Sequence, residues 1–188
     1  VQIGTPSDNT VSTAKIQNLA VTTAKIAADA VDGTKIADDA VNVEHIASGS
    51  LLVTADAQSN TVVGTNAGNS FTGTDATHNT LIGAEAGTAI TSGDYNVAVG
   101  SLALDANTTG DSNNAFGYLA LSSNTTGDDN NAFGESALIF NTTGSNNTAF
   151  GHSALNRNTT ASNNTAVGKS ALTENTTGTQ NTACGAYS

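Results

Sequence analysis

A repeat of short and nearly constant length governs the second half of the chain and limits what it can fold into. Glycine recurs after one step of 19 residues and then after six steps of 17, and an asparagine lies four residues before each glycine. The residue directly before each glycine is Val, Ile, Phe or Cys. The glycines are Gly64, Gly83, Gly100, Gly117, Gly134, Gly151, Gly168 and Gly185, and the asparagines are Asn60, Asn79, Asn96, Asn113, Asn130, Asn147, Asn164 and Asn181.

This period predicts a mainly β fold over residues 60–188, a parallel β-roll or β-solenoid in which each seventeen-residue repeat forms one coil. Helical-pair repeats and propeller blades need more than about thirty residues, so neither fits. We expect two short strands in each coil, with the sequences Asn-Thr-Ala-Phe-Gly and Ser-Ala-Leu. The intervening Asn-Thr-Thr-Gly and Gly-Ser-Asn-Asn segments are rich in residues that favour turns.

Stacked coils place identical residues above one another at about 4.8 Å, so each repeated position becomes a column. Asparagine columns are expected to bond amide to amide, and threonine columns hydroxyl to hydroxyl. Each glycine is expected at a tight corner or a close backbone approach. The structural columns that best represent the repeat are Asn113, Asn130, Asn147 and Asn164, and Gly117, Gly134, Gly151 and Gly168.

A second repeat, with a period of ten residues, occupies the N-terminal part of the chain. Its consensus is V-x-x-A-K-I-x-x-x-A, which suits short helical turns alternating with extended links. One unit cannot bury its own Val and Ile, so chains must associate or units must stack. We therefore expect residues 1–50 to form a fibrous stalk, residues 51–59 a junction, and the whole chain an intertwined parallel homotrimer. The expected trimer contacts are Val11, Ile16, Val21, Ile26, Val31 and Ile36.

Two family resemblances follow from these units. The segments 146–151 (NNTAFG) and 163–168 (NNTAVG) resemble the Asn-Ser-Val-Ala-Ile-Gly repeats of YadA-like trimeric adhesin heads. That resemblance implies a left-handed parallel β-roll in a homotrimer, although the coil here is a few residues longer and Thr or Asn replaces the family's Val. The segment 21–27 (VTTAKIA) is similar to repeats in bacteriophage tail fibres, which are also trimeric.

Charge and composition argue against several kinds of partner. The net charge is −11 with only five Lys and Arg, so no basic patch is available for nucleic acid. No apolar run reaches the roughly 18 residues that a membrane-spanning helix needs, so membrane insertion is not expected. The chain begins at Val1 without an initiator Met or a signal peptide, which indicates processing or a piece of a longer protein. The single cysteine, Cys184, stands in a column otherwise apolar and is interpreted as a structural residue.

Candidate chemical sites are few, and each has a simpler structural interpretation. His45, His78 and His152 occupy unrelated columns, so we predict no metal or catalytic site from them. A column of acids, Asp94, Asp111 and Asp128, is compatible with Ca²⁺, but its continuation as serine favours solvated turns. The acids Glu85, Glu135 and Glu174 show no partner spaced for glycosidase chemistry within one chain. The glycosylation sequons are interpreted as turn ladders; they begin at Asn107, Asn124, Asn141, Asn146, Asn158, Asn163 and Asn175.

These observations predict a protein that is not an enzyme and uses no cofactor or metal. The expected function is a structural and adhesive segment of a trimeric fibre, either a phage tail fibre or a bacterial cell-surface adhesin. Its expected partners are itself, other fibre segments or virion or cell-surface proteins, and a host surface glycan or protein. The expected location is extracellular. Two alternatives remain: a subunit of a self-assembling extracellular filament and, with weaker support from the Asn-Thr-Thr columns, an ice-binding β-solenoid.

Overall fold

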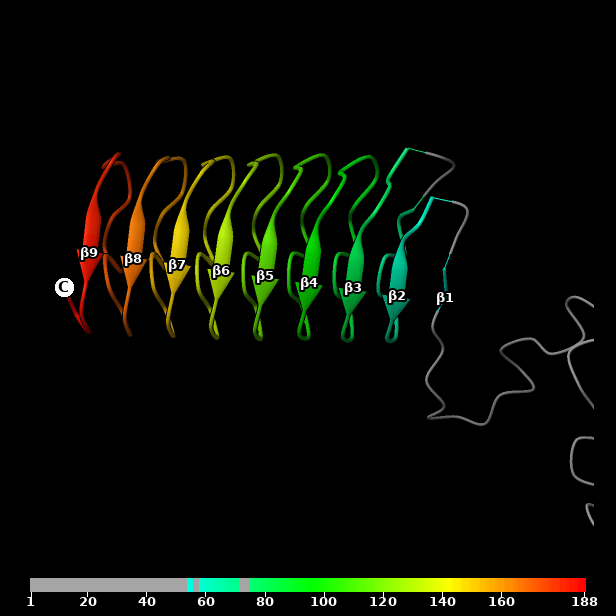
Figure 1. The fold of residues 1–188 in the computed structure, drawn as a ribbon, viewed down its shortest axis with the longest axis horizontal. Helices are drawn as coiled ribbons and strands as arrows, with labels where there is room; N and C mark the ends of the chain where they lie inside the picture. Colours follow the sequence, from blue (N-terminus) through cyan, green and yellow to red (C-terminus); the bar gives the residue numbers. More distant parts are fainter. Residues whose placement is uncertain (1–53, 56–57, 72–74) are drawn as a thin grey trace, which may run out of the picture. The chain divides into compact units, whose positions relative to one another are not determined.

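The computed structural model describes residues 54–55, 58–71 and 75–188, which form a single β-solenoid (Figure 1). The expected stalk over residues 1–50 lies outside the described residues, and so do the expected trimer contacts Val11, Ile16, Val21, Ile26, Val31 and Ile36. Within the described ranges, nine strands make one sheet in sequence order. They are β1 (Thr54–Ala55), β2 (Thr61–Val63), β3 (Thr80–Ile82), β4 (Val97–Val99), β5 (Asn114–Phe116), β6 (Asn131–Phe133), β7 (Thr148–Phe150), β8 (Thr165–Val167) and β9 (Thr182–Cys184).

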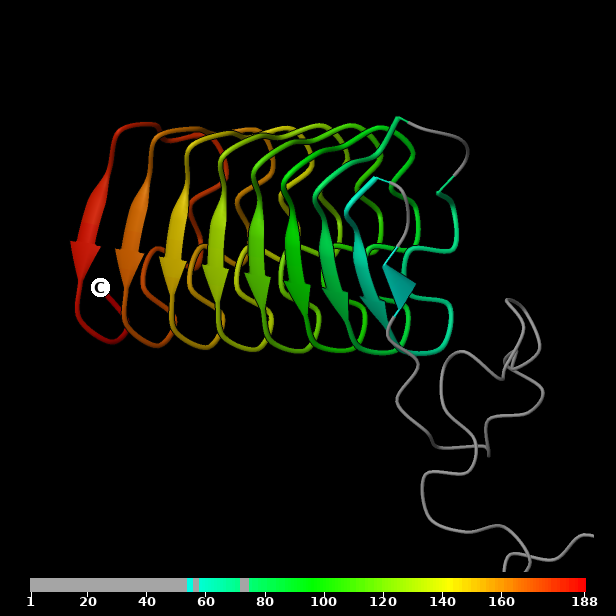
Figure 2. The ribbon, with the colours of Figure 1, turned by 45° about the vertical axis from the view of Figure 1, so that its right-hand side comes forward.

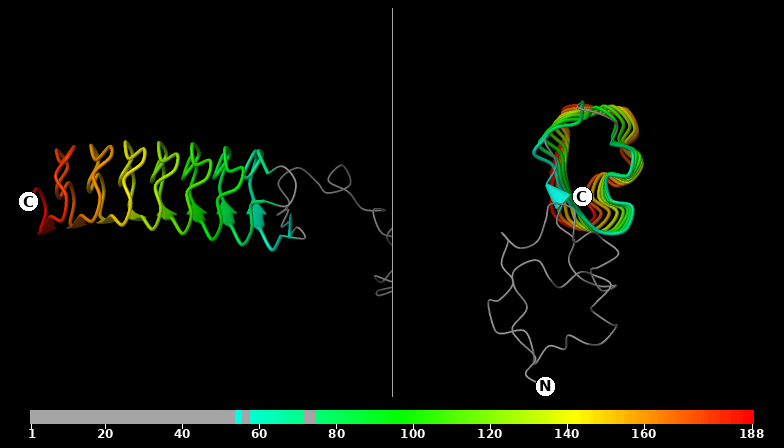
Figure 3. Two further views of the ribbon diagram at one scale, coloured as in Figure 1. Left: turned by 90° about the horizontal axis from the view of Figure 1, so that it is seen from above. Right: turned by 90° about the vertical axis from the view of Figure 1, so that its right-hand side faces the viewer.

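The strands β2 to β9 pair in parallel, and equivalent repeat positions are always partners. Phe116 pairs with Phe133, and Phe133 pairs with Phe150. The sequence-predicted parallel register is therefore confirmed, including the first and longer step, in which Thr61 pairs with Thr80. Seen along the solenoid axis, the coils superpose on one another (Figure 3, right), and an oblique view shows the strands side by side with the turns behind them (Figure 2).

The interior of each coil is narrow and filled by small or medium side chains. The middle residue of each strand points inward and is fully buried from β3 to β8, in most coils as alanine. Two further buried residues come from the turn side, for example Ala137 and Leu138. The core is therefore a set of Ala and Leu columns, which explains why the sequence contains no Trp or Met and few aromatic residues.

Asparagine columns supply the polar half of the interior. Asn130 is fully buried; its Nδ2 donates to the Gly144 carbonyl at 2.8 Å and to Asn113 Oδ1 at 3.1 Å. Its Oδ1 in turn accepts hydrogen bonds from the backbone N–H and the Nδ2 of Asn147, both at 3.1 Å. The expected amide-to-amide ladder is confirmed, and it satisfies each buried side chain completely.

The threonine columns behave differently from the expectation. The Oγ1 of Thr108 donates to the carbonyl of Thr125 at 3.0 Å, and Thr125 and Thr142 repeat the pattern. The ladder therefore runs from hydroxyl to backbone instead of from hydroxyl to hydroxyl. The Thr125 carbonyl also accepts the backbone N–H of Thr108 at 2.9 Å, so the hydroxyl adds a second hydrogen bond to the same acceptor.

The corner glycines close each strand and allow the next coil to approach. Gly134 has a φ of +138°, and an added Cβ would lie 2.6 Å from the carbonyl carbon and oxygen of Gly151. Real Cβ atoms do not tolerate such contacts, and this φ is one that L side chains rarely adopt. Both parts of the expectation for this column, a tight corner and a close backbone approach, are correct.

The second expected strand does not form. In each later coil, Ser-Ala-Leu lies in a turn in which the serine and the leucine have positive φ, 57° at Ser136 and 52° at Leu138. Neighbouring coils still bond here, because the Leu138 N–H donates to the Ala154 carbonyl at 3.0 Å. Left-handed conformations at non-glycine residues cost about 1–2 kcal/mol each. Burial of the leucine and the repeated backbone bonds offset that cost.

The left-handed position at Ser136 leads to a testable expectation. We expect Ser136→Gly to stabilise the protein by about 0.5 kcal/mol, because relief of the left-handed strain exceeds the extra entropy that glycine adds to the unfolded chain. Urea unfolding followed by circular dichroism measures it. A loss of stability would show that the Ser136 side chain contributes more than its backbone costs.

The first strand differs from the others. β1 pairs with β2 in the antiparallel sense, with Thr54 opposite Val62. It lies within the segment that we expected to be an irregular junction, and it covers the outer edge of β2.

Within the described ranges, no helix is long and apolar enough to cross a membrane.

Candidate interaction surfaces

The outward side of the parallel sheet is an uncharged surface that runs along the solenoid. We call it the sheet face, and it consists of the first and third residues of β2 to β9, since the middle residues point inward. The first residues are Thr61, Thr80, Val97, Asn114, Asn131, Thr148, Thr165 and Thr182, and the third residues, which we call the apolar ladder, are Val63, Ile82, Val99, Phe116, Phe133, Phe150, Val167 and Cys184.

Three phenylalanines form the centre of the apolar ladder. The rings of Phe116 and Phe133 are stacked at 4.8 Å between centroids and 7° between planes, and Phe133 stacks on Phe150 at 5.6 Å. Phe150 remains 57% exposed. Because the rings cover one another's faces, they present mostly their edges outward. A sugar ring stacks on an aromatic face, so this ladder is poorly shaped for a glycan and better shaped for apolar contact.

Charge is confined to the other surfaces of the described solenoid. The described residues include nine acidic and two basic side chains, and none of these charged side chains belongs to the sheet face. Most lie on exposed turn positions, among them Asp111, Asp129 and Glu135. Arg157 and Glu174, in adjacent coils, form an exposed ion pair at 3.0 Å. The sheet face is thus a neutral stripe on a predominantly acidic molecule.

The acidic column forms hydrogen bonds along the axis. The backbone N–H of Asp94 donates to Asp111 Oδ1 at 2.8 Å, and that of Asp111 donates to Asp128 Oδ1 at 2.8 Å. The serines continue the same bond, from the N–H of Asp128 to Ser145 Oγ at 3.0 Å. The turn interpretation accounts for the column, and no group of three His, Cys, Asp or Glu in the described residues is arranged to hold a metal ion.

The asparagines of the Asn-Thr-Thr sequons are fully buried, except Asn175 in the last coil, which is half-buried. Asn124 is fully buried, and its Nδ2 donates to the Gly127 carbonyl and to Asn107 Oδ1, both at 2.9 Å. Asn141 and Asn158 repeat these contacts. The side-chain nitrogen that glycosylation would modify is therefore already part of the folded ladder. The asparagines of the other two sequons, Asn146 and Asn163, are exposed.

The same turns give little support to an ice-binding surface. Thr108, Thr125, Thr142 and Thr159 are half-buried, and their hydroxyls bond to carbonyls, so each of these coils presents one exposed threonine, as at Thr109 and Thr126. A single threonine column does not make the flat two-column array that this function requires.

The histidines and glutamates that we considered are scattered. His78 stacks on Tyr95 at 5.0 Å, and His152 is exposed in another column. His45 lies outside the described residues. Glu85, Glu135 and Glu174 are all exposed. The structure does not bring any of these side chains together into a common site within the described part of the chain.

One acid is held in an unfavourable position. Asp105 is half-buried, and its Oδ1 is buried without a hydrogen-bond partner. Burial raises the pKa of Asp105 above its ordinary value of 3.8; nearby Glu85 raises it further, and backbone hydrogen bonds at Asp105 and Ala106 lower it. Its column holds Ser122 and Asn156 in later coils, so neutral side chains fit there.

We expect Asp105→Asn to raise the melting temperature modestly at pH 7. The folded-state pKa lies above the unfolded one, so the ionised carboxylate destabilises the fold at neutral pH. This penalty decreases as pH falls through the folded-state pKa and is absent below the unfolded value, where the variant and the natural protein should melt alike. The matched control is Asp75→Asn, which removes the same charge at an exposed position. An equal effect of both substitutions would point to net charge instead of burial.

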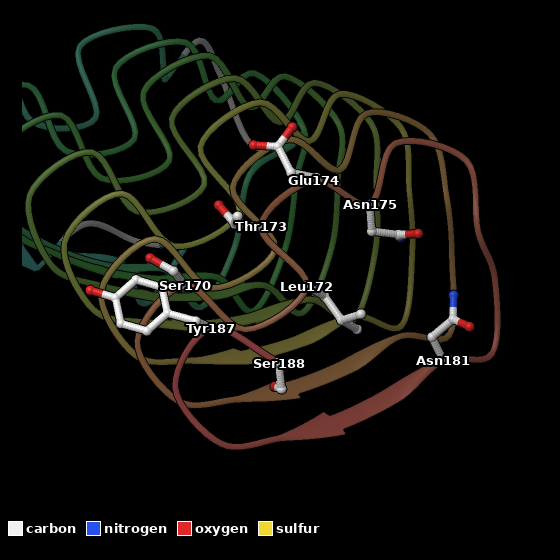
Figure 4. Close-up of a pocket in the computed structure, with 8 residues that line it drawn as sticks. All are labelled: Ser170, Leu172, Thr173, Glu174, Asn175, Asn181, Tyr187 and Ser188. Atoms are coloured by element: carbon white, nitrogen blue, oxygen red, sulfur yellow. The ribbon is translucent and has the colours of Figure 1, made fainter.

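At the C-terminal coil the interior of the solenoid is open to solvent on one side, whereas in each earlier coil the following coil covers it. A hollow of about 440 Å³ is lined by Ser170, Leu172, Thr173, Glu174, Asn175, Asn181, Tyr187 and Ser188 (Figure 4). Leu172 is the equivalent of the fully buried Leu138, yet it is only half-buried. The hollow therefore has the shape of a stacking surface for another coil and lacks convergent charged or catalytic groups.

Sequence reasoning identified the columns but missed the sheet face. The residue before each glycine was recognised as apolar, and the structure places it on the outward side of the sheet, including Cys184, which is exposed. The signal was present in the alternation of Ala with Phe or Val, since alternate strand residues face opposite sides.

Comparisons of the chain with protein-family models, curated proteins and solved structures find no match in any of the three.

Proposed function

We propose that this chain is a structural and attachment segment of an extracellular trimeric fibre, such as a bacteriophage tail fibre or a bacterial surface adhesin. The observation that carries the proposal is the repetition of one coil in strict register from β2 to β9. Each coil adds length in one direction at about 4.8 Å and adds no new kind of site. Such an architecture suits a spacer or a display platform better than a compact enzyme.

Two further observations support the fibre assignment. The core consists of alanine, leucine and asparagine columns, so a coil buries little apolar area, and association with other copies would add to it. The decapeptide repeat carries a Val and Ile stripe that a single unit cannot cover. The proposed partners are two further copies of the chain, adjoining fibre or surface proteins, and a host surface glycan or protein.

Light scattering after size-exclusion chromatography tests the proposal on the full 188-residue chain. We expect a mass three times the 18.6 kDa of one chain, unchanged by dilution through the micromolar range. A folded monomer would contradict the trimeric fibre. Attachment is tested separately, by measuring whether the labelled trimer binds to intact cells and whether unlabelled trimer competes.

A filament subunit is the second candidate, and the ends of the sheet favour it. β1 covers one edge of the sheet, whereas β9 pairs only with β8 among the described residues, and the hollow of Figure 4 lies beside it. A solenoid whose terminal strand stays unpaired in the whole protein can add a further copy end to end, because that strand offers free backbone donors and acceptors. Electron microscopy at rising concentration separates the two: particles of one length indicate the fibre segment, and particles that lengthen indicate a filament.

A further inference from the structure

The sheet face has the properties of a surface that is covered in the assembled protein. Every member of the apolar ladder from β3 to β8 is an aromatic or branched aliphatic residue, and Ile82, Phe150 and Val167 are 39%, 57% and 38% exposed. Isolated exposed apolar residues are common, but a continuous apolar column is a mark of an interaction site.

We propose that the sheet face is the contact surface between copies of this chain, and that the copies run parallel with equivalent coils at the same level. This inference rests on the proposed homotrimer and names the surface and the register by which its copies meet. It differs from the contacts expected from the decapeptide stalk, since every residue involved belongs to the solenoid.

Electrostatics select this face for contact between identical copies. The described solenoid carries nine acidic and two basic side chains, so two copies repel one another through most of their surface. The sheet face contributes no charge, and its first column consists of Thr, Val and Asn. Close approach of two acidic molecules is therefore least costly along this stripe, where no carboxylate has to lose its water.

Periodicity identifies the occupant as a second copy. The ladder repeats once per coil, at the spacing of adjacent parallel strands. A partner has to repeat at the same interval to make the same contact at every coil. Another copy of this solenoid meets that condition, because its coils have the same spacing. The stacked phenylalanines expose their edges, which can pack against the ladder of a neighbour, as aromatic edges do in protein interiors.

The register follows from rotational symmetry. In a closed parallel assembly, each copy presents the same surface to the common axis, so residues nearest the axis meet their own counterparts. Phe133 would then meet Phe133 of the other copies, and Cys184 would meet Cys184. An antiparallel pair would instead place Cys184 opposite the N-terminal end of the ladder, near Val63.

The first test measures the mass of the full chain carrying Phe133→Glu by light scattering. We expect at least a tenfold rise in the concentration at which the assembly dissociates, because a carboxylate would be buried in every copy at the same level. The control is Phe140→Glu, the same chemical change at a residue that is 50% exposed and outside the sheet face, and it should leave the mass unchanged. A second variant, Val167→Lys, changes a residue without ring stacking and should dissociate the assembly while circular dichroism stays the same.

The second test uses the natural cysteine as a probe of register. Treatment of the wild-type protein with a short bis-maleimide should give covalent dimers through Cys184, and Phe133→Glu should abolish them at the same protein concentration. A wild-type assembly that Phe133→Glu and Val167→Lys leave intact would overturn the inference and leave the proposed trimer standing. An assembly without cross-linked dimers would overturn the parallel register, and a monomeric wild type would overturn both proposals.

Discussion

Replacing Gly134 with valine is expected to lower the stability of the solenoid by more than about 3 kcal/mol and its melting temperature by about 10 °C. A Cβ at this position would lie 2.6 Å from the carbonyl carbon and oxygen of Gly151 and 2.9 Å from the backbone nitrogen of His152. All three atoms belong to the backbone of the next coil, so none can rotate away. Moving that coil would break the bond from the Gly151 N–H to the Phe133 carbonyl, which is 2.7 Å long.

The matched control for this substitution is Glu135→Val, one residue further along the chain. Glu135 is exposed, and we expect valine there to change the stability by no more than about 0.5 kcal/mol. Thermal unfolding followed by circular dichroism compares the two variants directly. Equal melting temperatures would mean that the coils can separate at the glycine corner without loss, and the assignment of this column would be wrong.

Replacing Asn130 with leucine, a side chain of similar size, is expected to cost about 2–6 kcal/mol. The substitution leaves the backbone N–H of Asn147 and one hydrogen of its Nδ2 without an acceptor in a fully buried position, at about 1–3 kcal/mol for each group. The Gly144 carbonyl keeps its bond from Asn141 at 2.9 Å, so it does not add to the loss. Hydrogen exchange should show faster exchange of the Asn147 amide than in the natural protein.

Asn131→Leu provides the comparison for this prediction. Asn131 is half-buried on the sheet face and accepts one bond, from Asn114 Nδ2 at 2.9 Å. The same column holds valine at position 97, so an apolar residue fits there. We expect a change within about 0.5 kcal/mol. A loss as large as that of Asn130→Leu would indicate that the substitution of any asparagine, and not the buried ladder, controls stability.

The parts of the fold that could be predicted from the sequence are those in which a repeated residue type can play only one structural role in a stack of coils. A glycine at a fixed interval required a backbone that approaches its neighbour closely, and a buried asparagine column required amide bonds along the axis. Both follow from stacking alone, so they could be stated before the structure. The register of β2 to β9 follows from the same columns.

The prediction failed where an apolar pair has two possible conformations. Ala137 and Leu138 are adjacent and both buried, which an alternating strand does not allow, since neighbouring residues would face opposite sides. A left-handed leucine resolves this conflict by turning the chain so that both side chains enter the core. Sequence propensity disfavours that conformation for leucine, and burial of the side chain together with the backbone bonds between coils offsets the cost. The antiparallel strand β1 was missed because two residues outside the repeat carry no periodic signal.

Strands of this solenoid contact only the strand before and the strand after them. The consequence is that the coil is also a unit of length that can be counted. Removing the residues of one whole repeat, such as 118–134, would join two chain segments that already occupy equivalent positions in neighbouring coils. Every column would close again on the same kind of partner, and the cross-section would stay the same. Insertion or deletion of whole repeats therefore changes the length of the solenoid in steps of one coil, each about 4.8 Å, and the number of repeats determines that length.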